Sequence, residues 1–359
     1  MTQESASEGR QDGSSPPVQE GKENRGKRRF RLVTKGRVFA LLIVAAGGML
    51  FAGYGHYTDP GPLQTERVVV IPRGGADRVI TVLQDNGVLA RGVVSSFFFK
   101  AAMLATHSQG SIHAAELKFP ERVSMAHSLD ILRHGRPVTH SLTIAEGLTA
   151  RRIRTLLTQA PALQGETPPI PEGSVAPQTF FYVWGMERSA LLQHMTGLMK
   201  DTVQDVWARR DQSALEGVVT TPEQLLVLAS LIERETSLPE ERPQVARVFL
   251  NRLKQRMKLQ TDPTVIYALS DGEGVLSRSL THEDLQFDSP YNSYQHSGLP
   301  PGPICSPGRD SLEAAAHPAE GDALYFVATG HGGHRFAHTL SEQTENIRAY
   351  RRAKATGAQ

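Results

Sequence analysis

The amino-acid sequence predicts an α+β protein with an N-terminal transmembrane helix, a small α+β subdomain and a larger mixed α/β domain. Three observations predict this class. An uncharged apolar run near the N-terminus has the length of a membrane span, short β-branched segments lie between glycines and prolines, and helical periodicity dominates the rest. The 359 residues allow about two domains, and 39% hydrophobic residues supply enough apolar mass for a folded core.

The chain begins with a polar segment that is followed by a basic one. Residues 1–21 are mainly Ser, Gly, Gln, Glu and Pro, which offer little apolar surface to offset the entropy of ordering. Eight Lys and Arg residues then occur between Lys22 and Arg37, against the single acid Glu23. We therefore expect residues 1–37 to form a disordered, basic tail.

Residues 38–57 form the apolar run. They include no charged residue, and at 1.5 Å per residue a helix of this length reaches about 30 Å, the thickness of a bilayer's hydrocarbon core. A buried helix of a soluble protein and a cleaved signal peptide are the alternatives, but the adjacent basic block and the lack of an A-x-A cleavage site favour a membrane span. Because Lys and Arg collect on the cytoplasmic side, we expect a cytoplasmic N-terminus and extracytoplasmic residues 58–359.

Residues 65–145 have the pattern of a small α+β subdomain. The β-branched run 67–71 predicts a strand, apolar residues recur at helical spacing from Val79 and over 93–104, and a helix over 128–133 precedes an alternating strand over 138–144. The proline-rich segment 161–177 indicates a connection or a long surface loop. We assign residues 146–350 to the larger domain.

Glu235 is the strongest candidate for a catalytic residue. A helix is predicted from Pro222, with Thr221 as its N-cap, and its apolar positions are spaced i, i+3, i+4 and i+7: Leu225, Leu228, Ala229 and Ile232. At 100° per residue Glu235 continues this buried face, where desolvation raises a carboxyl pKa. A carboxyl group that stays protonated near neutral pH suits the general acid of glycosidic cleavage. A structural ion pair with Arg242 or Arg247 is the alternative.

Further polar residues follow Glu235 in patterns that organise a site. Glu233 lies off the apolar face and is predicted to be a solvated acid paired with Arg234 or Arg247. A second amphipathic helix from Pro243 carries Asn251. The candidate substrate-binding residues are Glu233, Asn251, Gln260, Thr261, Asp262, Tyr291, Asn292 and Tyr294.

The last six of these candidates lie in two predicted turns. In the turn 260–264, Asp262 is expected to cap the helix that follows. The loop 290–304 supplies Tyr291, Asn292 and Tyr294 for stacking on sugars and for hydrogen bonds to them. A proline-stiffened surface loop is the alternative for that segment.

Composition excludes several other classes of function. A net charge of +2 does not fit a nucleic-acid-binding protein, and a single cysteine, Cys305, allows neither a disulfide nor a Cys-based zinc site; we expect it to pack as a small hydrophobe. His331, His334 and His338 cluster in the sequence, but no HExxH motif surrounds them and glycines place two of them in a turn. The sequence also lacks a Walker loop, a dinucleotide fingerprint and a G-x-S-x-G elbow, so we expect no metal and no cofactor.

Four segments together resemble the YceG/MltG family of membrane-anchored endolytic murein transglycosylases. They are LASLIERET, RVFLNRLKQRMKLQTDPTVIYAL, PYNSYQHSGLPPGPI and SLEAAAHPAEGDALYFVATGHGGHRFAHTLSEQTENI. The resemblance implies that the module over 65–145 is LysM-like, that residues 146–350 are the catalytic domain, and that Glu235 is the catalytic glutamate. The family's E-G-x-x-x-P-x-T-[YF] element falls on Glu172-Gly173 through Phe180.

The resemblance also implies a reaction and a location. The expected activity is non-hydrolytic cleavage of glycan strands between N-acetylmuramic acid and N-acetylglucosamine, which leaves 1,6-anhydro-muramyl ends and terminates strand elongation. A muramidase-type hydrolase, with Asp262 as its second carboxylate, and a non-catalytic peptidoglycan-binding scaffold are the alternatives. The expected partners are glycan strands, the membrane and, as a further candidate, peptidoglycan synthases. The expected place is the cell inner membrane, crossed once, with the catalytic domain in the periplasm.

Overall fold

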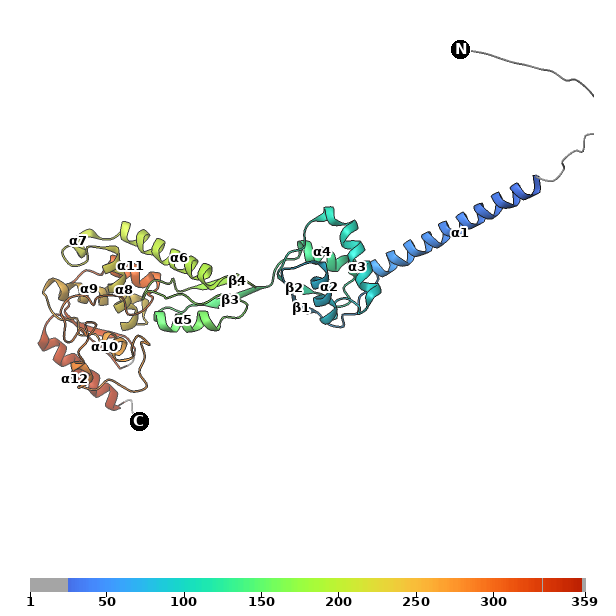
Figure 1. The fold of residues 1–359 in the computed structure, drawn as a ribbon. Helices are drawn as coiled ribbons and strands as arrows, with labels where there is room; N and C mark the ends of the chain where they lie inside the picture. Colours follow the sequence, from blue (N-terminus) through green and yellow to red (C-terminus); the bar gives the residue numbers. More distant parts are fainter. Residues whose placement is uncertain (1–24, 331, 357–359) are drawn as a thin grey trace, which may run out of the picture. The chain divides into compact units, whose positions relative to one another are not determined.

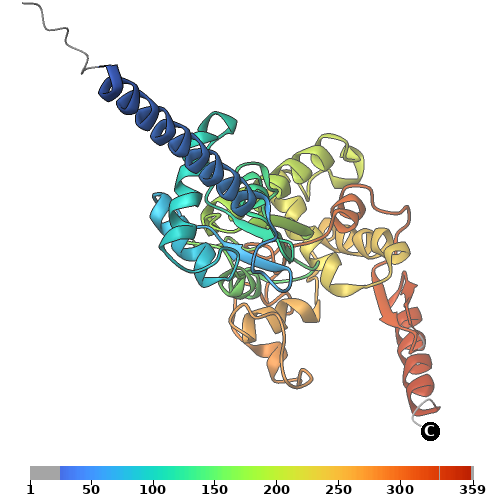
Figure 2. The same ribbon diagram turned by 90° about the vertical axis from the view of Figure 1, so that its right-hand side faces the viewer.

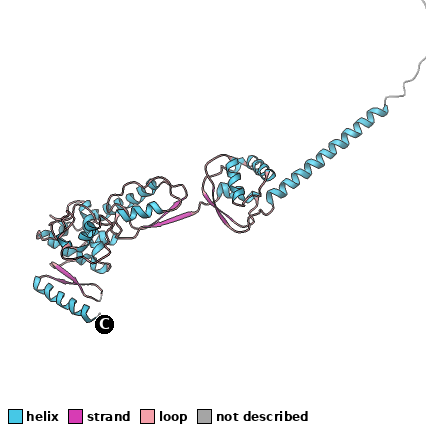
Figure 3. Ribbon diagram, turned by 60° about the horizontal axis from the view of Figure 1, so that its bottom comes forward, coloured by secondary structure: helices cyan, strands magenta, loops and turns pink. Residues whose placement is uncertain are grey.

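Helices dominate the fold, and the short strands are paired two by two (Figures 1 and 3). The computed structural model describes residues 25–330 and 332–356. The chain forms two compact units. Of the described residues, the first comprises 25–67, 75–112 and 119–133, and the second comprises 68–74, 113–118, 134–330 and 332–356.

A single long helix, α1 (Arg25–Thr58), leads into the first unit. Its stretch Arg37–Thr58 is long and apolar enough to cross a membrane, and none of the large apolar side chains in that stretch is buried. The helix begins at Arg25 and thus includes residues that sequence reasoning assigned to a disordered tail over 1–37. Lys and Arg are good helix formers, so the basic block extends a helix that the apolar run nucleates. Residues 1–24 of the expected tail lie outside the described residues.

Three other helices of the first unit agree with the predicted ones: α2 (Ala76–Asp85), α3 (Val93–Ala105) and α4 (Met125–His134). The 3-10 helix η1 (His107–Gln109) was not predicted. Val79 and Leu83 of α2 are buried, as their helical spacing predicted, together with Phe99 of α3 and Leu129 of α4.

The strands form three two-stranded sheets in the described part of the chain. β1 (Arg67–Val70) pairs with β2 (Glu116–Phe119), and β3 (Thr139–Thr143) pairs antiparallel with β4 (Thr179–Val183). Sequence reasoning grouped the strand over 138–144 with the small module, but its partner lies in the second unit. A strand must satisfy its backbone groups by pairing, and this partner is supplied from beyond the proline-rich segment.

The second unit is built mainly of helices around α8. Besides β3, β4 and most of the residues of β1 and β2, it contains α5 (Ala150–Gln159), α6 (Arg188–Ala208), α7 (Gln212–Leu215), α8 (Pro222–Glu235), η2 (Pro239–Glu241), α9 (Arg242–Lys254), α10 (Asp262–Leu269), η3 (Asp284–Gln286), α11 (Arg309–Ala316), β5 (Tyr325–Ala328), β6 (His334–Ala337) and α12 (Leu340–Thr356). α8 packs against α6, α9, α10 and α11. Every residue from Val227 to Ile232 is therefore buried, so α8 is enclosed on several sides and not along one stripe.

A hairpin and a helix close the second unit at its C-terminal end. β5 and β6 pair antiparallel, from Tyr325 opposite Ala337 to Ala328 opposite His334, and α12 packs on both strands (Figure 2). This hairpin brings His334 back to the end of η2, next to the last turn of α8.

Candidate active site

Glu235 is the last residue of α8. The helix begins as predicted: the Thr221 hydroxyl accepts a hydrogen bond from the backbone N–H of Gln224, and Pro222 occupies the first turn. A buried helix that ends at Glu235 carries this carboxylate from the core to a partly buried position. Glu235 thus lies at the end of a buried helix, with its own side chain partly buried.

One hydroxyl contacts the carboxylate directly. Thr261 donates from Oγ1 to Oε2 of Glu235 over 2.7 Å, and it is the single hydrogen-bond donor to that carboxylate among the described residues. Burial raises the pKa of Glu235, and the negative charge of Asp262 raises it further. The Thr261 hydrogen bond and the charges of His334 and Arg252 act in the opposite direction, but burial outweighs them. Glu235 is therefore a carboxyl group biased toward its protonated form.

The turn that presents Thr261 is fixed by Ser293. The backbone N–H of Thr261 donates to Ser293 Oγ over 3.0 Å, and the N–H of Gln260 donates to the Ser293 carbonyl over 3.1 Å. Thr264 Oγ1 lies 2.9 Å from Ser293 Oγ. Both Ser293 and Thr264 are buried. Neither was among the predicted site residues, because no local pattern shows that two turns 30 residues apart in sequence are hydrogen-bonded to each other.

Asp262 and Tyr294 also connect these two turns. Tyr294 donates its hydroxyl hydrogen to Oδ1 of Asp262 over 2.7 Å. The prediction that Asp262 caps the following helix is wrong: Thr261 is the N-cap of α10, no side chain caps that helix, and Asp262 is already its first residue. Its carboxylate is instead exposed on the side of Glu235 and Tyr294.

A histidine–glutamate pair lies close to Glu235. Glu241 accepts hydrogen bonds from the backbone N–H of His334 over 2.6 Å and, at its Oε2, lies 2.7 Å from His334 Nδ1. Thr236 also donates to Glu241 over 3.1 Å. Burial alone would raise the pKa of Glu241, but these hydrogen bonds outweigh it and hold that pKa below its usual value. Sequence reasoning considered His334 only as a metal ligand, and its glycine-rich surroundings gave no other signal.

Glu233 does not have the predicted solvated position. Its side chain is only 6% exposed, and Oε2 accepts from the backbone N–H of Gly308 over 2.9 Å and from Ser311 Oγ over 2.7 Å. Arg242 lies 3.5 Å from Oε1. Because α8 is enclosed by other helices, a residue off the predicted stripe faces α11 and not water. Arg242, named as an alternative partner of Glu235, thus pairs with Glu233, and Arg247 donates to the Ala319 carbonyl.

Two other predicted substrate-binding residues hold the fold together instead. Asn292 is fully buried and donates to the carbonyls of Leu285 and Phe287. Asn251 donates to the carbonyls of Gly321 and Ala323, which fixes the segment before β5. Buried or engaged amides of this kind are not available to a sugar.

Gln260 and Tyr291 remain near the site. Gln260 has an exposed side chain and a φ of +48°, an unusual backbone conformation for a residue other than glycine. Tyr291 is half-buried, and its ring packs 4.9 Å from that of Tyr267. The structure therefore brings Glu235, Gln260, Thr261, Asp262 and Tyr294 together. Tyr291 lies two residues before Ser293, whose hydrogen bonds hold the turn that carries Thr261.

Glu172 lies in the segment 172–180, which resembles the family's E-G-x-x-x-P-x-T-[YF] element, and it contacts the helices α5 and α10. Its Oε1 accepts from the backbone N–H of Ala150 over 2.8 Å, at the start of α5, and its Oε2 accepts from the Tyr267 hydroxyl over 3.1 Å. Burial raises the pKa of Glu172, although these hydrogen bonds oppose the shift. Gly173 has a φ of +71°, and a Cβ there would lie 2.7 Å from Pro303, so this turn requires glycine.

The histidine cluster does not form a metal site in the described residues, where no three His, Cys, Asp or Glu side chains gather in a suitable way. His334 pairs with Glu241 and His338 with Asp322, while His331 lies outside the described residues. Cys305 is buried, as expected for a small hydrophobe.

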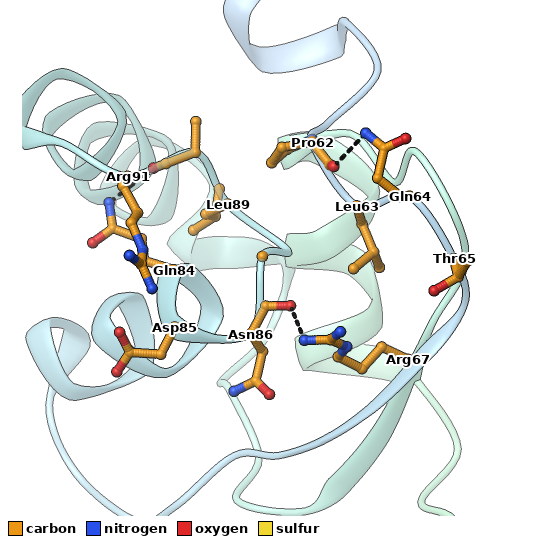
Figure 4. Close-up of a pocket in the computed structure, with 12 residues that line it drawn as sticks. Pro62, Leu63, Gln64, Thr65, Arg67, Gln84, Asp85, Asn86, Leu89 and Arg91 are labelled. Atoms are coloured by element: carbon orange, nitrogen blue, oxygen red, sulfur yellow. Dashed lines mark hydrogen bonds between the residues drawn. The ribbon is translucent and has the colours of Figure 1, made fainter.

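A cavity of about 390 Å³ lies in the first unit (Figure 4). It is bounded by the segment 62–67 and by residues 84–91, and Arg67 donates across it to the carbonyl of Asn86 over 3.0 Å. Asp85 is the one carboxylate in its lining. No carboxyl group in this lining is hydrogen-bonded to a side-chain hydroxyl in the way that Glu235 is bonded to Thr261 in the second unit.

Comparison with known proteins identifies curated relatives of this chain. An endolytic murein transglycosylase of Bacillus subtilis is 47% identical over 126 residues, which cover 35% of this chain and 34% of that protein. An endolytic murein transglycosylase of Streptococcus pneumoniae strain D39 is 26% identical over 358 residues, which cover 86% of this chain and 63% of that protein. The chain thus spans less than two thirds of the length of these curated relatives.

A solved structure and a family model complete the comparison. The crystal structure of a yceG-like protein from Listeria monocytogenes is 27% identical, with a TM-score of 0.47 over 78% of this chain and 98% of that one. The model of the YceG-like family matches residues 68–349. Since that match runs from β1 into α12 and includes every residue gathered around Glu235, the chain belongs to the YceG-like family.

Proposed function

We propose that this chain is an endolytic lytic transglycosylase of peptidoglycan, with Glu235 as its acid and base. The observation that carries the proposal is the setting of Glu235: a carboxyl group with a raised pKa, held by one hydroxyl and by no arginine ion pair among the described residues. Such a group can both deliver and take up a proton, whereas a carboxylate locked in an ion pair cannot. The names of the curated relatives support the same reading.

The reaction then needs two proton transfers. Protonated Glu235 gives its proton to the glycosidic oxygen as the bond between N-acetylmuramic acid and N-acetylglucosamine breaks. The resulting carboxylate takes the proton of the sugar's own 6-hydroxyl as that oxygen attacks the anomeric carbon. The proton balance closes, no water is consumed, and the product carries a 1,6-anhydro end. The Thr261 hydrogen bond stabilises Glu235 in its ionised state between the two transfers.

Asp262 favours a second candidate, a muramidase-type hydrolase. Its charge acts on Glu235, so two carboxyl groups share the site. In a hydrolase the second carboxylate serves as nucleophile or activates water. Tyr294 already donates to Oδ1 of Asp262, which stabilises the carboxylate and makes it a weaker base or nucleophile. We therefore prefer the lytic reaction.

Mass spectrometry of glycan strands digested by the wild type and two variants tests the proposal. The wild type should release anhydro ends, which lack the water of a reducing end. Glu235→Gln should lower release by about 10²- to 10⁴-fold, and Asp262→Asn should retain it. Reducing ends that disappear in Asp262→Asn would establish the hydrolase. Unchanged digestion by Glu235→Gln would refute both enzymatic candidates, and strand binding without any digestion by the wild type would leave the non-catalytic scaffold.

The proposal also includes the membrane location of the chain and the nature of the region 65–145. We propose that Arg37–Thr58 crosses the cell inner membrane once, with a cytoplasmic N-terminus and a periplasmic catalytic unit, because the basic residues precede the span. We also propose that the region 65–145 is LysM-like, which the strand–helix–helix–strand order from β1 to β2 supports. Glycan strands are then its substrate, and peptidoglycan synthases are candidate neighbours.

A further inference from the structure

The helix α3 exposes a continuous apolar stripe. Val93, Val94, Phe97 and Leu104 leave 85%, 65%, 65% and 75% of their surfaces uncovered. Together with exposed Ala101 they fall on one side of the helix, because residues three, four and seven apart share a face. Ser95 and Phe99 are buried on the other side, so this stripe is the outer face of α3. Large apolar patches of this kind mark a binding surface on a folded protein.

The stripe lies next to the proposed membrane span. α3 packs on the C-terminal part of α1 (Figure 1). There the ring of Phe98 lies 5.3 Å from that of His56 and against Gly53. A mostly apolar cavity of about 370 Å³ extends between the two helices, and Met49, Leu50, Ala101 and Ala105 are among the residues that line it. The apolar surfaces of α1 and α3 are therefore adjacent.

The geometry sets the level of α3 relative to a bilayer. The α1 residues that border this cavity begin at Met49, which at 1.5 Å per residue is about 14 Å along the helix axis from the end of the apolar stretch at Thr58. A bilayer that Arg37–Thr58 crosses must therefore extend to the depth at which α3 packs against α1. The helix itself, Val93–Ala105, is apolar but too short to cross a membrane.

The charge pattern of α3 fits the same placement. Lys100 is its one charged residue, and its ammonium group pairs with Asp77 of α2. This pairing directs the charge toward the rest of the unit, at the edge of the stripe. A long lysine side chain at such an edge can keep its charge in the polar headgroup region while the neighbouring residues lie among acyl chains.

We propose that the outer stripe of α3 is embedded in the bilayer leaflet next to the C-terminal end of α1, so that two elements and not one hold the first unit to the membrane. The partner of this surface is lipid: acyl chains cover Val93, Val94, Phe97, Ala101 and Leu104 and fill the cavity along α1. The inference rests on the proposed membrane span. It makes α3 an interfacial helix whose depth is set by its packing on α1.

Fluorescent labels on single introduced cysteines test the proposal in the full chain, reconstituted in phosphatidylcholine–phosphatidylglycerol vesicles. Cys305 is fully buried and will not react in the folded protein. Phe97→Cys and Leu104→Cys place a label on the stripe, Val44→Cys places it within α1, and Asp85→Cys is the matched control at an exposed polar position of the first unit. Each label is challenged with brominated lipids and with aqueous iodide.

The proposal expects the labels at 97 and 104 to be quenched by the brominated lipids and to be several-fold less accessible to iodide than the label at 85. Aqueous labels at 97 and 104 with a lipid-quenched label at 44 would overturn the inference and leave the membrane span intact. An aqueous label at 44 would overturn the span itself and the inference with it. Labels at 97 and 104 that are shielded from iodide without lipid quenching would show a protein partner, such as a second copy, and would also overturn it.

Discussion

Replacing Glu233 by Gln should destabilise the second unit while leaving its chemistry in place. The Glu233 carboxylate accepts two charge-assisted hydrogen bonds, from Gly308 N–H and Ser311 Oγ, and it faces the buried guanidinium of Arg242. A hydrogen bond to a charged group contributes about 1 kcal/mol more than one to a neutral group, so the two bonds lose about 2 kcal/mol. The lost ion pair adds to this, although Glu146 at 3.7 Å and Asp310 at 3.6 Å still compensate Arg242. We expect a total loss of about 2–4 kcal/mol.

Thermal unfolding of the full chain in detergent, followed by circular dichroism, measures this loss. For a unit of this size the expected decrease in Tm is about 5–15 °C. Glu313→Gln is the matched control, because Glu313 pairs with Arg209 and Arg309 near the surface and should contribute less than about 1 kcal/mol. At a temperature where the variant is folded, Glu233→Gln should still cleave glycan strands. A Tm equal to that of the control, or a stable but inactive Glu233→Gln, would refute the structural role given to Glu233.

The remaining predictions concern Glu235 and the topology. Glu235→Gln should lower the cleavage rate by about 10²- to 10⁴-fold, and its stability should hold or rise. The folded pKa of Glu235 is raised above 4.5, so its contribution to the free energy of unfolding is fully present below pH 4.5 and is lost as pH rises through the raised pKa. Denaturant titrations at several pH values should show this loss of stability in the wild type and not in Glu235→Gln. Wild-type activity should fall as pH rises through the same raised pKa, and a flat profile would contradict an acid at this position. Thr261→Val removes a hydrogen bond that lowers the Glu235 pKa, so the alkaline limb of its pH–rate profile should move to higher pH. A reporter fused to the C-terminal end should be active only outside the cytoplasm, and cytoplasmic activity would overturn the orientation.

The sequence was sufficient wherever the interactions are local. Thr221 and Pro222 begin α8 as predicted, since capping depends on residues within one turn. Helical spacing also predicted α2 and α3, and the phase of α8 placed Glu235 beside a buried face. The motifs that resemble the YceG/MltG family predict Glu235 as the catalytic acid, and that role stays a prediction.

Only the tertiary structure decided which acid is structural and which is available. Periodicity gives the angle of a residue around a helix axis, but it does not say how many neighbours enclose that helix. Because α6, α9, α10 and α11 surround α8, Glu233 lies against the start of α11 and pairs with Arg242, while Glu235 meets the hydroxyl of Thr261. The joining of two distant turns through Ser293, and the return of His334 beside Glu241, likewise depend on contacts between segments far apart in sequence, for which local propensity carries no information.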